Sequence, residues 1–219
     1  MKIDLHTHTV YGSGCSHIEP SDLVEQAKRV GLDGICITEH NQLWEPERIE
    51  KLSRKHDFLV IGGVEVLTEH GEILVFGYHE PVRWVRHAAE LKEKVNRAGG
   101  FMIAAHPFRN QPILSRTEKG GMDVDAGCSL PLLKYVDALE AFNGWAYRHE
   151  WQFTLAVADR LGLKGTGGSD AHKLLQTGLC YTEFERPIHN EEDFLVELKA
   201  GRFAPVNCYY GASPIPVKA

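Results

Sequence analysis

The chain has 219 residues, of which 43% are hydrophobic and 25% are charged, and this composition suffices for one globular core. The net charge of −6 argues against a broad basic surface for duplex nucleic acid, although a local basic pocket for one phosphate is compatible with it. No apolar run approaches the roughly 20 residues of a membrane span and no signal peptide precedes the first strand, so we expect a cytoplasmic protein without a membrane partner.

The cysteines also indicate a reducing compartment. Their number is odd, they are widely scattered, and no Cys-x-x-Cys pair occurs, which argues against a disulfide framework and against a structural zinc knuckle. We therefore expect free thiols at Cys15, Cys36, Cys128, Cys180 and Cys208.

Hydrophobic periodicity predicts strands that alternate with helices along most of the chain. A short strand leads into His6, and apolar residues at helical spacing then indicate a helix over residues 21–30, with Ser21 as its N-cap. The turn at residues 68–71 between two apolar runs predicts a hairpin, which interrupts the alternation. The remaining expected elements are strands over residues 33–38, 58–65, 101–105, 137–142, 164–167 and 178–184, and helices over residues 46–56, 82–98, 147–161 and from Asn190 to Gly201.

Repeated strand and helix units with short connections favour a parallel sheet. About seven such units fit a distorted seven-stranded (β/α) barrel, TIM-barrel-like, with one β-hairpin excursion, and an open doubly wound α/β sheet is the alternative. Since no repeat or linker is visible, we expect residues 1–219 to form a single domain. The one long irregular stretch, residues 109–130, carries Arg116 and Lys119 and is a candidate lid over the substrate.

Candidate metal ligands stand at the carboxyl ends of the predicted strands. His6 and His8 follow the first strand, and because residues i and i+2 of an extended segment face the same way, both imidazoles can hold one ion. In a parallel barrel these strand ends converge on one face, which is where active sites lie. The other candidates at strand ends are the pair Glu39-His40, Glu65, His106, Asn143, Asp170 and His172.

The types of these residues indicate which metals they would bind. Histidine nitrogens mixed with carboxylate oxygens, without a thiolate cluster, suit zinc, manganese or iron. Two ions close together need a bridging carboxylate to offset their repulsion, and Glu65 is the best-placed candidate. We expect Asp4 to orient one of the ligands from behind.

The motifs DLHTHT, ITEHN, GVE, AHPF and GGSDAH, in this order and spacing, resemble those of the polymerase and histidinol phosphatase (PHP) superfamily. The resemblance covers nearly the whole chain, and it implies a seven-stranded β/α barrel that holds up to three metal ions and hydrolyses phosphoesters. Carried over by position, it places one ion on His6, His8, Glu65 and Asp170, a second on Glu65 and His106, and a third on His40 and His172.

The chain departs from this pattern after its first motif. Relatives usually supply an acid or a histidine to the third ion there, but residues 11–17 read YGSGCSH, with Gly14 and no acid. Cys15 and His17 are the candidates to replace it. The presence of a third ion is therefore an open point of the sequence.

A second departure lies in the hairpin. Many relatives place a histidine on the strand after the turn, and the equivalent position here is Glu72. If the two strands are antiparallel, Glu72 lies nearest the metal end. We favour Glu72 as a ligand over His79, which lies further along the returning strand, and over His70 in the turn.

The expected activity is metal-dependent phosphoesterase activity, with two or three divalent zinc, manganese or iron ions as cofactors. A metal-bound hydroxide would attack phosphorus near Glu65, and His172 or His40 would assist the leaving oxygen. We expect the substrate to be a phosphomonoester or a small nucleotide or oligonucleotide, hence a small phosphorylated molecule or a short single strand. Because phosphate needs fixed polar partners and arginine offers a planar fork, the candidate substrate-binding residues are Arg109, Asn143 and Arg148.

Two other interpretations stay open. An amidohydrolase-like enzyme would use the same hydroxide to cleave a C–N bond, but such barrels often carry a carboxylated lysine, and no lysine stands at a ligand-bearing strand end. A catalytically degenerate metal-binding scaffold is favoured slightly by Gly14 and Glu72. The intact histidines and acids of the other motifs oppose it.

Overall fold

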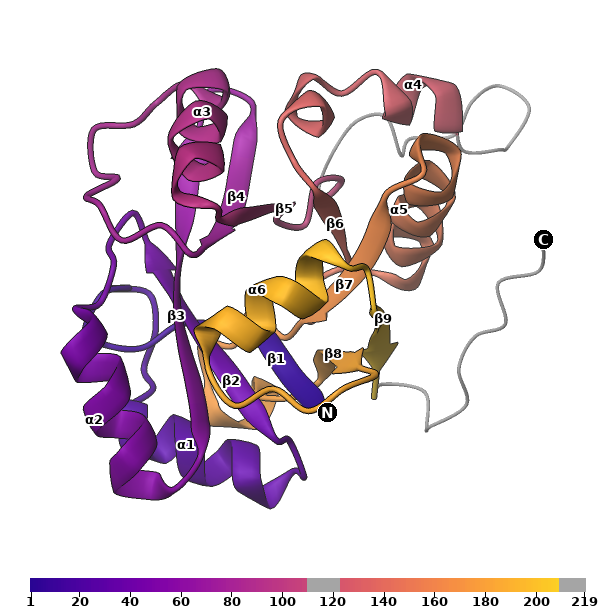
Figure 1. The fold of residues 1–219 in the computed structure, drawn as a ribbon. Coiled ribbons are helices and arrows are strands. Elements are labelled where there is room, and N and C mark those ends of the chain that lie inside the picture. The colour runs from indigo at the N-terminus through magenta and orange to yellow at the C-terminus, as the bar shows by residue number, and fades with distance from the viewer. Residues whose placement is uncertain (110–122, 209–219) are drawn as a thin grey trace.

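The computed structural model of the chain describes residues 1–109 and 123–208. These residues form a mixed α/β fold in which helices flank a strongly curved sheet (Figure 1). The strands are β1 Lys2–Thr7, β2 Gly34–His40, β3 Leu59–Thr68, β4 Gly71–Phe76, β5 Phe101–Ala104, β6 Ala138–Asn143, β7 Lys164–Gly168, β8 Cys180–Phe184 and β9 Phe203–Asn207. The helices are α1 Pro20–Arg29, α2 Pro46–His56, α3 Ala88–Ala98, α4 Val124–Cys128, α5 Arg148–Leu161 and α6 Glu191–Lys199, with short 3-10 helices η2 Pro131–Lys134 and η3 Leu174–Gln176.

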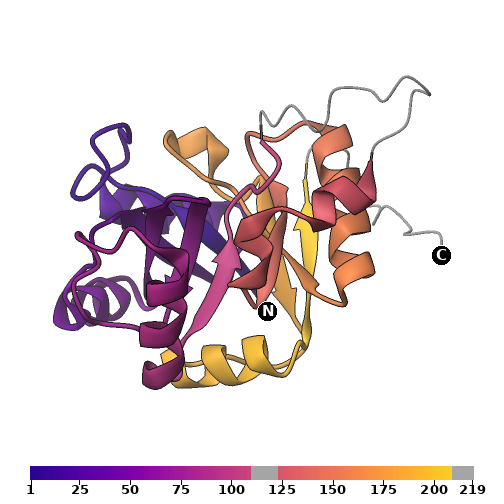
Figure 2. The same ribbon diagram turned by 90° about the horizontal axis from the view of Figure 1, so that it is seen from above.

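The sheet is a nearly closed barrel. Its strand order is β7-β6-β5-β4-β3-β2-β1-β8-β9, and β1, β2 and β3 run parallel to one another, as do β5, β6 and β7. Strand β7 also packs against β1, β8 and β9, and a parallel bridge joins Thr7 to Ala171 just after β7. The curvature thus brings the two ends of the sheet together, as the view from above shows (Figure 2). The predicted TIM-barrel-like fold class is confirmed.

The described part of the chain has nine strands, whereas the sequence predicts seven. Strand β4 is no excursion, because it lies between β3 and β5 and pairs antiparallel with both. The sequence does not predict β9, because Pro205 interrupts its apolar run and lacks the N–H that a central strand needs. Strand β9 pairs antiparallel with β8 at the end of the strand order, where proline is tolerated. Strand β8 is itself antiparallel to β1.

Helix α3 begins at Ala88, later than the predicted start at residue 82. Val82 and Val85 have helical spacing and are buried, but they belong to a turn in which Val85 N–H donates to Val82 O at 2.9 Å. Burial of both side chains in this turn produces the apolar pattern that suggested an earlier helix start.

The starts of α1 and α6 test the two predicted N-caps. Helix α1 begins at Pro20 with Glu19 in the N-cap position. Ser21 therefore lies inside the first turn, and its prediction as the N-cap is wrong. Proline starts the helix one residue earlier because its fixed φ suits the first helical position. Asn190 caps α6 as predicted, and its side chain accepts a 2.8 Å hydrogen bond from Asp193 N–H.

The long stretch over residues 109–130 contains the short helix α4, whose N-cap residue is Asp123. Residues 110–122, which include Arg116 and Lys119, lie outside the described residues. The predicted lid therefore stays a prediction.

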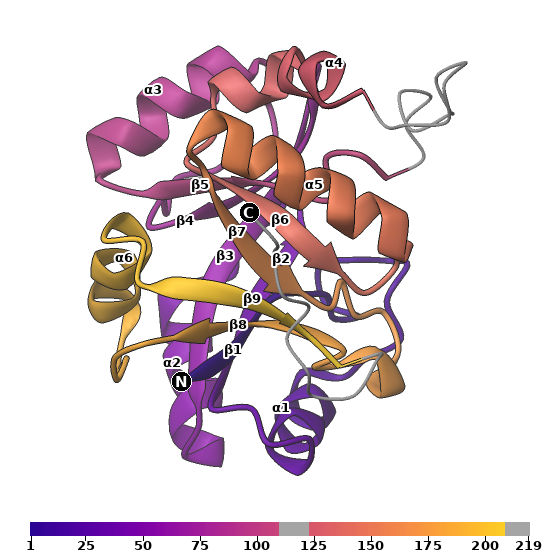
Figure 3. The same ribbon diagram turned by 90° about the vertical axis from the view of Figure 1, so that its right-hand side faces the viewer.

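Side chains alternate between the interior of the barrel and its helix-covered outer face. On β4, Leu74 and Phe76 face the interior in line with Glu72, whereas Ile73 and Val75 pack outward in a cluster shared with α3 and α5. Figure 3 shows α5 lying across β6 and β7 on this outer face.

Helix α6 closes the barrel at the end where the N terminus lies (Figures 1 and 2). Phe194 on α6 is fully buried and meets Phe76 edge to face, with 5.2 Å between ring centroids. The interior is therefore apolar at this end, and its polar residues gather at the carboxyl ends of the parallel strands. None of the helices in the described ranges is long and apolar enough to span a membrane.

Replacement of Phe194 by alanine is expected to lower the free energy of unfolding by about 3–5 kcal/mol, because it leaves a cavity between α6 and the barrel. Urea unfolding followed by circular dichroism measures the change. Leu175, which is 85% exposed, is the control, and its replacement by alanine should change stability by less than about 0.5 kcal/mol. Equal effects at both positions would contradict the closing role of α6.

Candidate metal centre

Backbone hydrogen bonds fix the first two histidines at the end of β1. Asp170 N–H donates to His6 O at 2.7 Å, and His8 N–H donates to Ala171 O at 3.1 Å. Both histidines are completely buried. The end of β1 and the segment after β7 thus place His6, His8 and Asp170 side by side.

Glu140 on β6 orients the His6 ring. Its Oε1 lies 2.9 Å from His6 Nδ1, so a proton on Nδ1 donates to this carboxylate and Nε2 faces Glu65 and Asp170 at 3.4 and 3.5 Å. Burial alone would lower the pKa of His6, but the three surrounding carboxylates raise it well above its ordinary value. This shift belongs to the metal-free chain, because a metal ion binds only the deprotonated nitrogen.

His8 is held in the same manner through a hydroxyl group. Its Nδ1 lies 3.0 Å from Ser13 Oγ, and Ser13 donates to Glu39 Oε2 at 2.6 Å. Nδ1 therefore carries the proton, and Nε2 points toward Asp170 Oδ1 at 3.3 Å. Burial lowers the pKa of His8 to about 4, so this imidazole is neutral at pH 7 and keeps a lone pair on Nε2.

Glu65 on β3 lies at the centre of the group and is almost completely buried. Its Oε1 is 3.0 Å from His106 Nε2, and its Oε2 is 2.8 Å from His40 Nδ1. Burial alone would raise the pKa of Glu65, but the charge on His6 and hydrogen bonds from the other two histidines hold it well below its usual range. Each oxygen of this carboxylate thus faces a different set of imidazoles, as a bridging ligand requires.

Asp170 and His106 both adopt backbone conformations that residues other than glycine rarely adopt. Their φ angles are 53° and 31°, and strain of this kind concentrates at functional sites. His106 N–H donates to Glu140 Oε2 at 2.9 Å, which holds the residue in place. Its Nε2 lies 3.6 Å from Glu72 Oε2, so the structure brings Glu72 to the centre as predicted.

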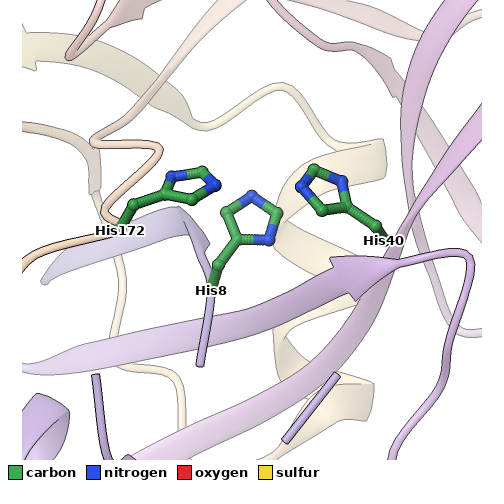
Figure 4. Close-up of side chains that lie close together, drawn as sticks. All are labelled: His8, His40 and His172. Carbon is green, nitrogen blue, oxygen red and sulfur yellow. The ribbon is translucent and has the colours of Figure 1, made fainter. Parts of the chain in front are cut away.

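His8, His40 and His172 form a second group of imidazoles (Figure 4). The ring centroid of His8 lies 4.4 Å from that of His40 and 4.5 Å from that of His172. His172 Nδ1 is 2.9 Å from Asp170 O, so it donates to that carbonyl and leaves Nε2 for another partner. The three side chains converge from the residue after β1, from the end of β2 and from the segment after β7.

The donor atoms of this centre fit divalent transition-metal ions. Among the buried side-chain atoms of the described residues, Nε2 of His6 and Nε2 of His8 make no hydrogen bond, and an unsatisfied polar atom is costly unless a ligand meets it. Both oxygens of Glu140 accept hydrogen bonds, Oε1 from His6 and Oε2 from His106 N–H and Asn143, so in this structure Glu140 supports the neighbouring ligand candidates. The side-chain groups whose ligand atoms lie within 4.8 Å of one another are His8, His40 and His172; His6, His8 and Asp170; His6, His106 and Glu140; and His40, Glu65 and Glu72.

Comparison with protein families identifies the fold and the motifs. The sequence model of the PHP domain matches residues 4–164. The chain belongs to the PHP domain family. The model of the PHP-associated family matches residues 152–203, and these two ranges together include each of the candidate metal ligands.

Two relatives come from Methanocaldococcus jannaschii. An uncharacterized protein of this organism is 30% identical over 155 residues, which cover 66% of this chain and 83% of the relative. A second uncharacterized protein of the same organism is 28% identical over 187 residues, or 84% of this chain and 70% of the relative.

Solved structures share the PHP fold at low sequence identity. A two-domain protein from Bacteroides vulgatus, described as containing a predicted PHP-like metal-dependent phosphoesterase, aligns with a TM-score of 0.71 and 20% identity over 94% of this chain. The chain spans 64% of that protein. An amidohydrolase from Chromobacterium violaceum aligns with a TM-score of 0.63 and 16% identity, over 94% of this chain and 98% of the other.

Arg109 reaches the candidate metal centre directly. One guanidinium nitrogen donates to Asp170 Oδ2 at 2.6 Å, and the other lies 2.9 Å from His106 Nε2. An ion held at His106 Nε2 would need the space that the Arg109 guanidinium group fills. Arg109 and the second ion therefore exclude one another from this position unless the arginine turns away.

The other two predicted substrate-binding residues differ from Arg109. Asn143 is buried, and its amide donates to Glu140 Oε2 at 2.9 Å and approaches Asp170 Oδ2 at 3.4 Å. It therefore supports the carboxylates of Glu140 and Asp170. Arg148 is exposed in the first turn of α5.

Two further acids support the centre, Glu140, to which the sequence analysis gives no role, and Glu39, one of the candidates at strand ends. Glu140 lies within the apolar strand ALEAF, where an acid is the one visible signal. Glu39 next to His40 is buried and accepts hydrogen bonds from Thr9 N–H and Trp44 Nε1 as well as from Ser13. Glu39 thus holds the loop after β1 in place beneath His8.

Trp145 also approaches the centre. Its Nε1–H donates to Asp170 O at 2.8 Å, and its ring lies 6.1 Å from that of His172. About half of its surface is exposed, so an apolar ring borders the metal candidates. The sequence offers no signal for this, since the aromatic residue stands in a loop.

Four other polar residues can now be placed. Asp4 accepts from the N–H groups of Ser169 and Gly178 at 2.8 and 3.0 Å, so it orients backbone, and burial raises its pKa to about 6. The other three are His79, which lies 2.9 Å from Glu191, His70, which stacks on Tyr135, and His17, which is exposed.

Replacement of Glu140 by glutamine is expected to weaken metal binding by about 10–100-fold, because His6 loses the carboxylate that fixes its ring and raises its basicity. Calorimetric titration of the metal-free protein with zinc measures the affinity. Glu183→Gln, on the exposed side of β8, is the control and should bind zinc as the wild type does. Unchanged affinity in Glu140→Gln would contradict the supporting role.

Proposed function

We propose that this PHP protein is a metal-dependent phosphoesterase that hydrolyses a small phosphomonoester or a short single-stranded nucleotide in the cytoplasm. Two or three zinc, manganese or iron ions would serve as its cofactors. The observation that carries this proposal is the convergence of two unpartnered buried imidazole nitrogens on Glu65 and Asp170, with an arginine at their edge.

The chain's own residues would divide the ions as follows. A divalent ion bound there lowers the pKa of a coordinated water from about 15.7 toward 7 and so supplies a nucleophile at neutral pH. Glu65 would bridge two positions, since its oxygens face different histidines. The proposed ligands are His6, His8, Glu65 and Asp170 for one ion, Glu65, Glu72 and His106 for the second, and His40 and His172 for the third.

Arg109 is the proposed phosphate ligand. In the structure its guanidinium group neutralises Asp170 and reaches His106. Once these two residues coordinate ions, the planar fork is free to donate to two phosphoryl oxygens, a geometry that lysine does not offer. The same side chain then serves the metal-free and the substrate-bound states.

His172 and His40 are placed to handle the proton of the leaving oxygen. The side chain of His172 is 17% exposed, and that of His40 is 34% exposed. Both therefore border the space that a substrate enters. Either can give a proton to the leaving oxygen when it is not itself bound to an ion.

Two features support a small substrate with a ring. A cavity of about 640 Å³ borders His40, which is within the size range of small-molecule sites. Trp145 exposes about half of its surface beside His172, and such a ring can stack on any nucleobase.

The amidohydrolase-like alternative shares the metal ligands and differs in the bond that is cleaved. The Chromobacterium neighbour is described as an amidohydrolase with bound sulfate, and sulfate has the tetrahedral shape of phosphate. None of the proposed ligands is a lysine, whereas an arginine suited to phosphate stands beside them. Arg109 therefore favours the phosphoester.

Replacement of Asp170 by asparagine is expected to lower phosphoester hydrolysis by more than about a hundredfold, the upper end of the loss for residues that only orient ligands. Phosphate release from phosphomonoesters, nucleotides and short oligonucleotides measures the activity, with amide substrates tested beside them. Asp159→Asn on the exposed face of α5 is the matched control. Full metal occupancy without turnover of any phosphoester, or turnover that Asp170→Asn leaves intact, would overturn the proposed function.

Replacement of Arg109 by lysine is expected to raise KM for the phosphorylated substrate by about 10–100-fold, because one or two charge-assisted hydrogen bonds are lost. Steady-state kinetics on the best substrate of the panel measures KM. Arg160→Lys, at a position that is 60% exposed and paired with Asp125, should leave KM unchanged. A normal KM in Arg109→Lys would assign the arginine to the metal-free state alone.

A further inference from the structure

The loop after β1 brings a thiol to the second group of imidazoles. Cys15 Sγ lies 3.1 Å from His172 Nε2. Ser16 on this loop donates through Oγ to His8 O at 2.8 Å, and His17 N–H donates to His172 O at 3.1 Å. These two hydrogen bonds, made by the residues directly after Cys15, hold the loop so that the sulfur lies beside the ring.

The nitrogen that faces this sulfur is the one that would bind an ion. His172 Nδ1 is occupied by Asp170 O at 2.9 Å, and His40 Nδ1 by Glu65 Oε2 at 2.8 Å. Each ring therefore has only Nε2 left as a ligand atom. With His40 and His172 alone the ion would have two protein ligands, which is fewer than the three or four that zinc sites in proteins use.

An observation independent of the cysteine points to a cation here. The ligand atoms of His8, His40 and His172 lie within 4.8 Å of one another (Figure 4). His8 Nε2 is fully buried and makes no hydrogen bond. It lies between Asp170 and the rings of His40 and His172, so a polar atom without a partner borders this group as well as the position of the first ion. The three imidazoles thus form a cation site before the thiol is considered.

We propose that Cys15 is a thiolate ligand of the ion held by His40 and His172, which gives this position a mixed nitrogen and sulfur donor set. The inference rests on the proposed metal-dependent function and names a ligand for one of its ions. Binding forms one metal–sulfur bond and releases the thiol proton to solvent. A thiolate favours zinc over manganese, whereas the positions around Glu65, Glu72 and Asp170 are rich in oxygen.

The different donor sets predict that the ions are not equivalent. Manganese suits carboxylate oxygens, and zinc or cobalt suits imidazole with thiolate. The Cys15 position should therefore keep zinc when the other positions exchange to manganese. It should also be lost when a thiol reagent modifies Cys15, which is exposed.

Cobalt provides the test, because a cobalt–thiolate bond gives a charge-transfer absorption in the near ultraviolet that nitrogen and oxygen ligands do not give. Full-length protein is stripped of metal, loaded with Co²⁺, and its spectrum and cobalt content per chain are measured. We expect the absorption in the wild type, its loss in Cys15→Ser, and a cobalt content lower by about one ion per chain in that variant. Cys15→Asp should keep the ion, through an oxygen ligand, and still lack the absorption.

Cys208→Ser is the matched control, since Cys208 is also exposed and lies after β9; it should keep both the absorption and the cobalt content. Absence of the absorption from cobalt-loaded wild type, or its persistence in Cys15→Ser, would overturn the inference and leave Cys15 as a hydrogen-bond partner of His172. Cobalt binding is measured without substrate. Failure of phosphoester hydrolysis would therefore count against the proposed function and leave the thiolate ligand standing, and the reverse also holds.

Discussion

The candidate metal centre depends on the backbone pairing that joins the end of β1 to the segment after β7. Two hydrogen bonds, from Asp170 N–H to His6 O and from His8 N–H to Ala171 O, set the distance between these segments. Gly168 permits the approach, because a Cβ at this position would lie 2.5 Å from the Cβ of His6. The ligands are thus positioned by main chain, which is stiffer than side-chain contact. The same two hydrogen bonds therefore close the barrel and bring the ligand candidates together.

Titratable groups buried together are unfavourable unless each meets an opposite charge or a hydrogen-bond partner. In this centre each histidine of the first group lies next to a carboxylate, for example His6 next to Glu140 and His106 next to Glu65. Glu140 supports the far nitrogen of His6, and Glu39 supports that of His8 through Ser13. This outer layer fixes the direction of both rings, so that their near nitrogens are left without partners. A bound cation would satisfy those atoms and would stabilise the folded chain by mass action.

The sequence predicts the ligands whose place follows from a single strand. His6 and His106 each follow an apolar run, and Asp170 follows the glycine-rich strand β7, so their shared face follows from local pattern and parallel topology. Pairing over long separations is not visible in this way. The insertion of β4 between β3 and β5 depends on the curvature of the whole sheet, and so does the approach of Glu140 to a histidine 134 residues away. An acid inside a strand looks like a solvent-facing residue until the barrel closes around it.

Glu65 has a consequence for how the centre fills. Its two oxygens face separate histidines, His106 on one side and His40 on the other, so ions on the two sides would draw on a single negative charge. Occupancy of one position then changes the affinity of the other by a coupling free energy that is reciprocal by thermodynamic necessity. A metal titration of this protein would accordingly show cooperative binding instead of independent binding at each position. The cooperativity is positive if bridging by the carboxylate outweighs the repulsion between the ions, and negative if it does not.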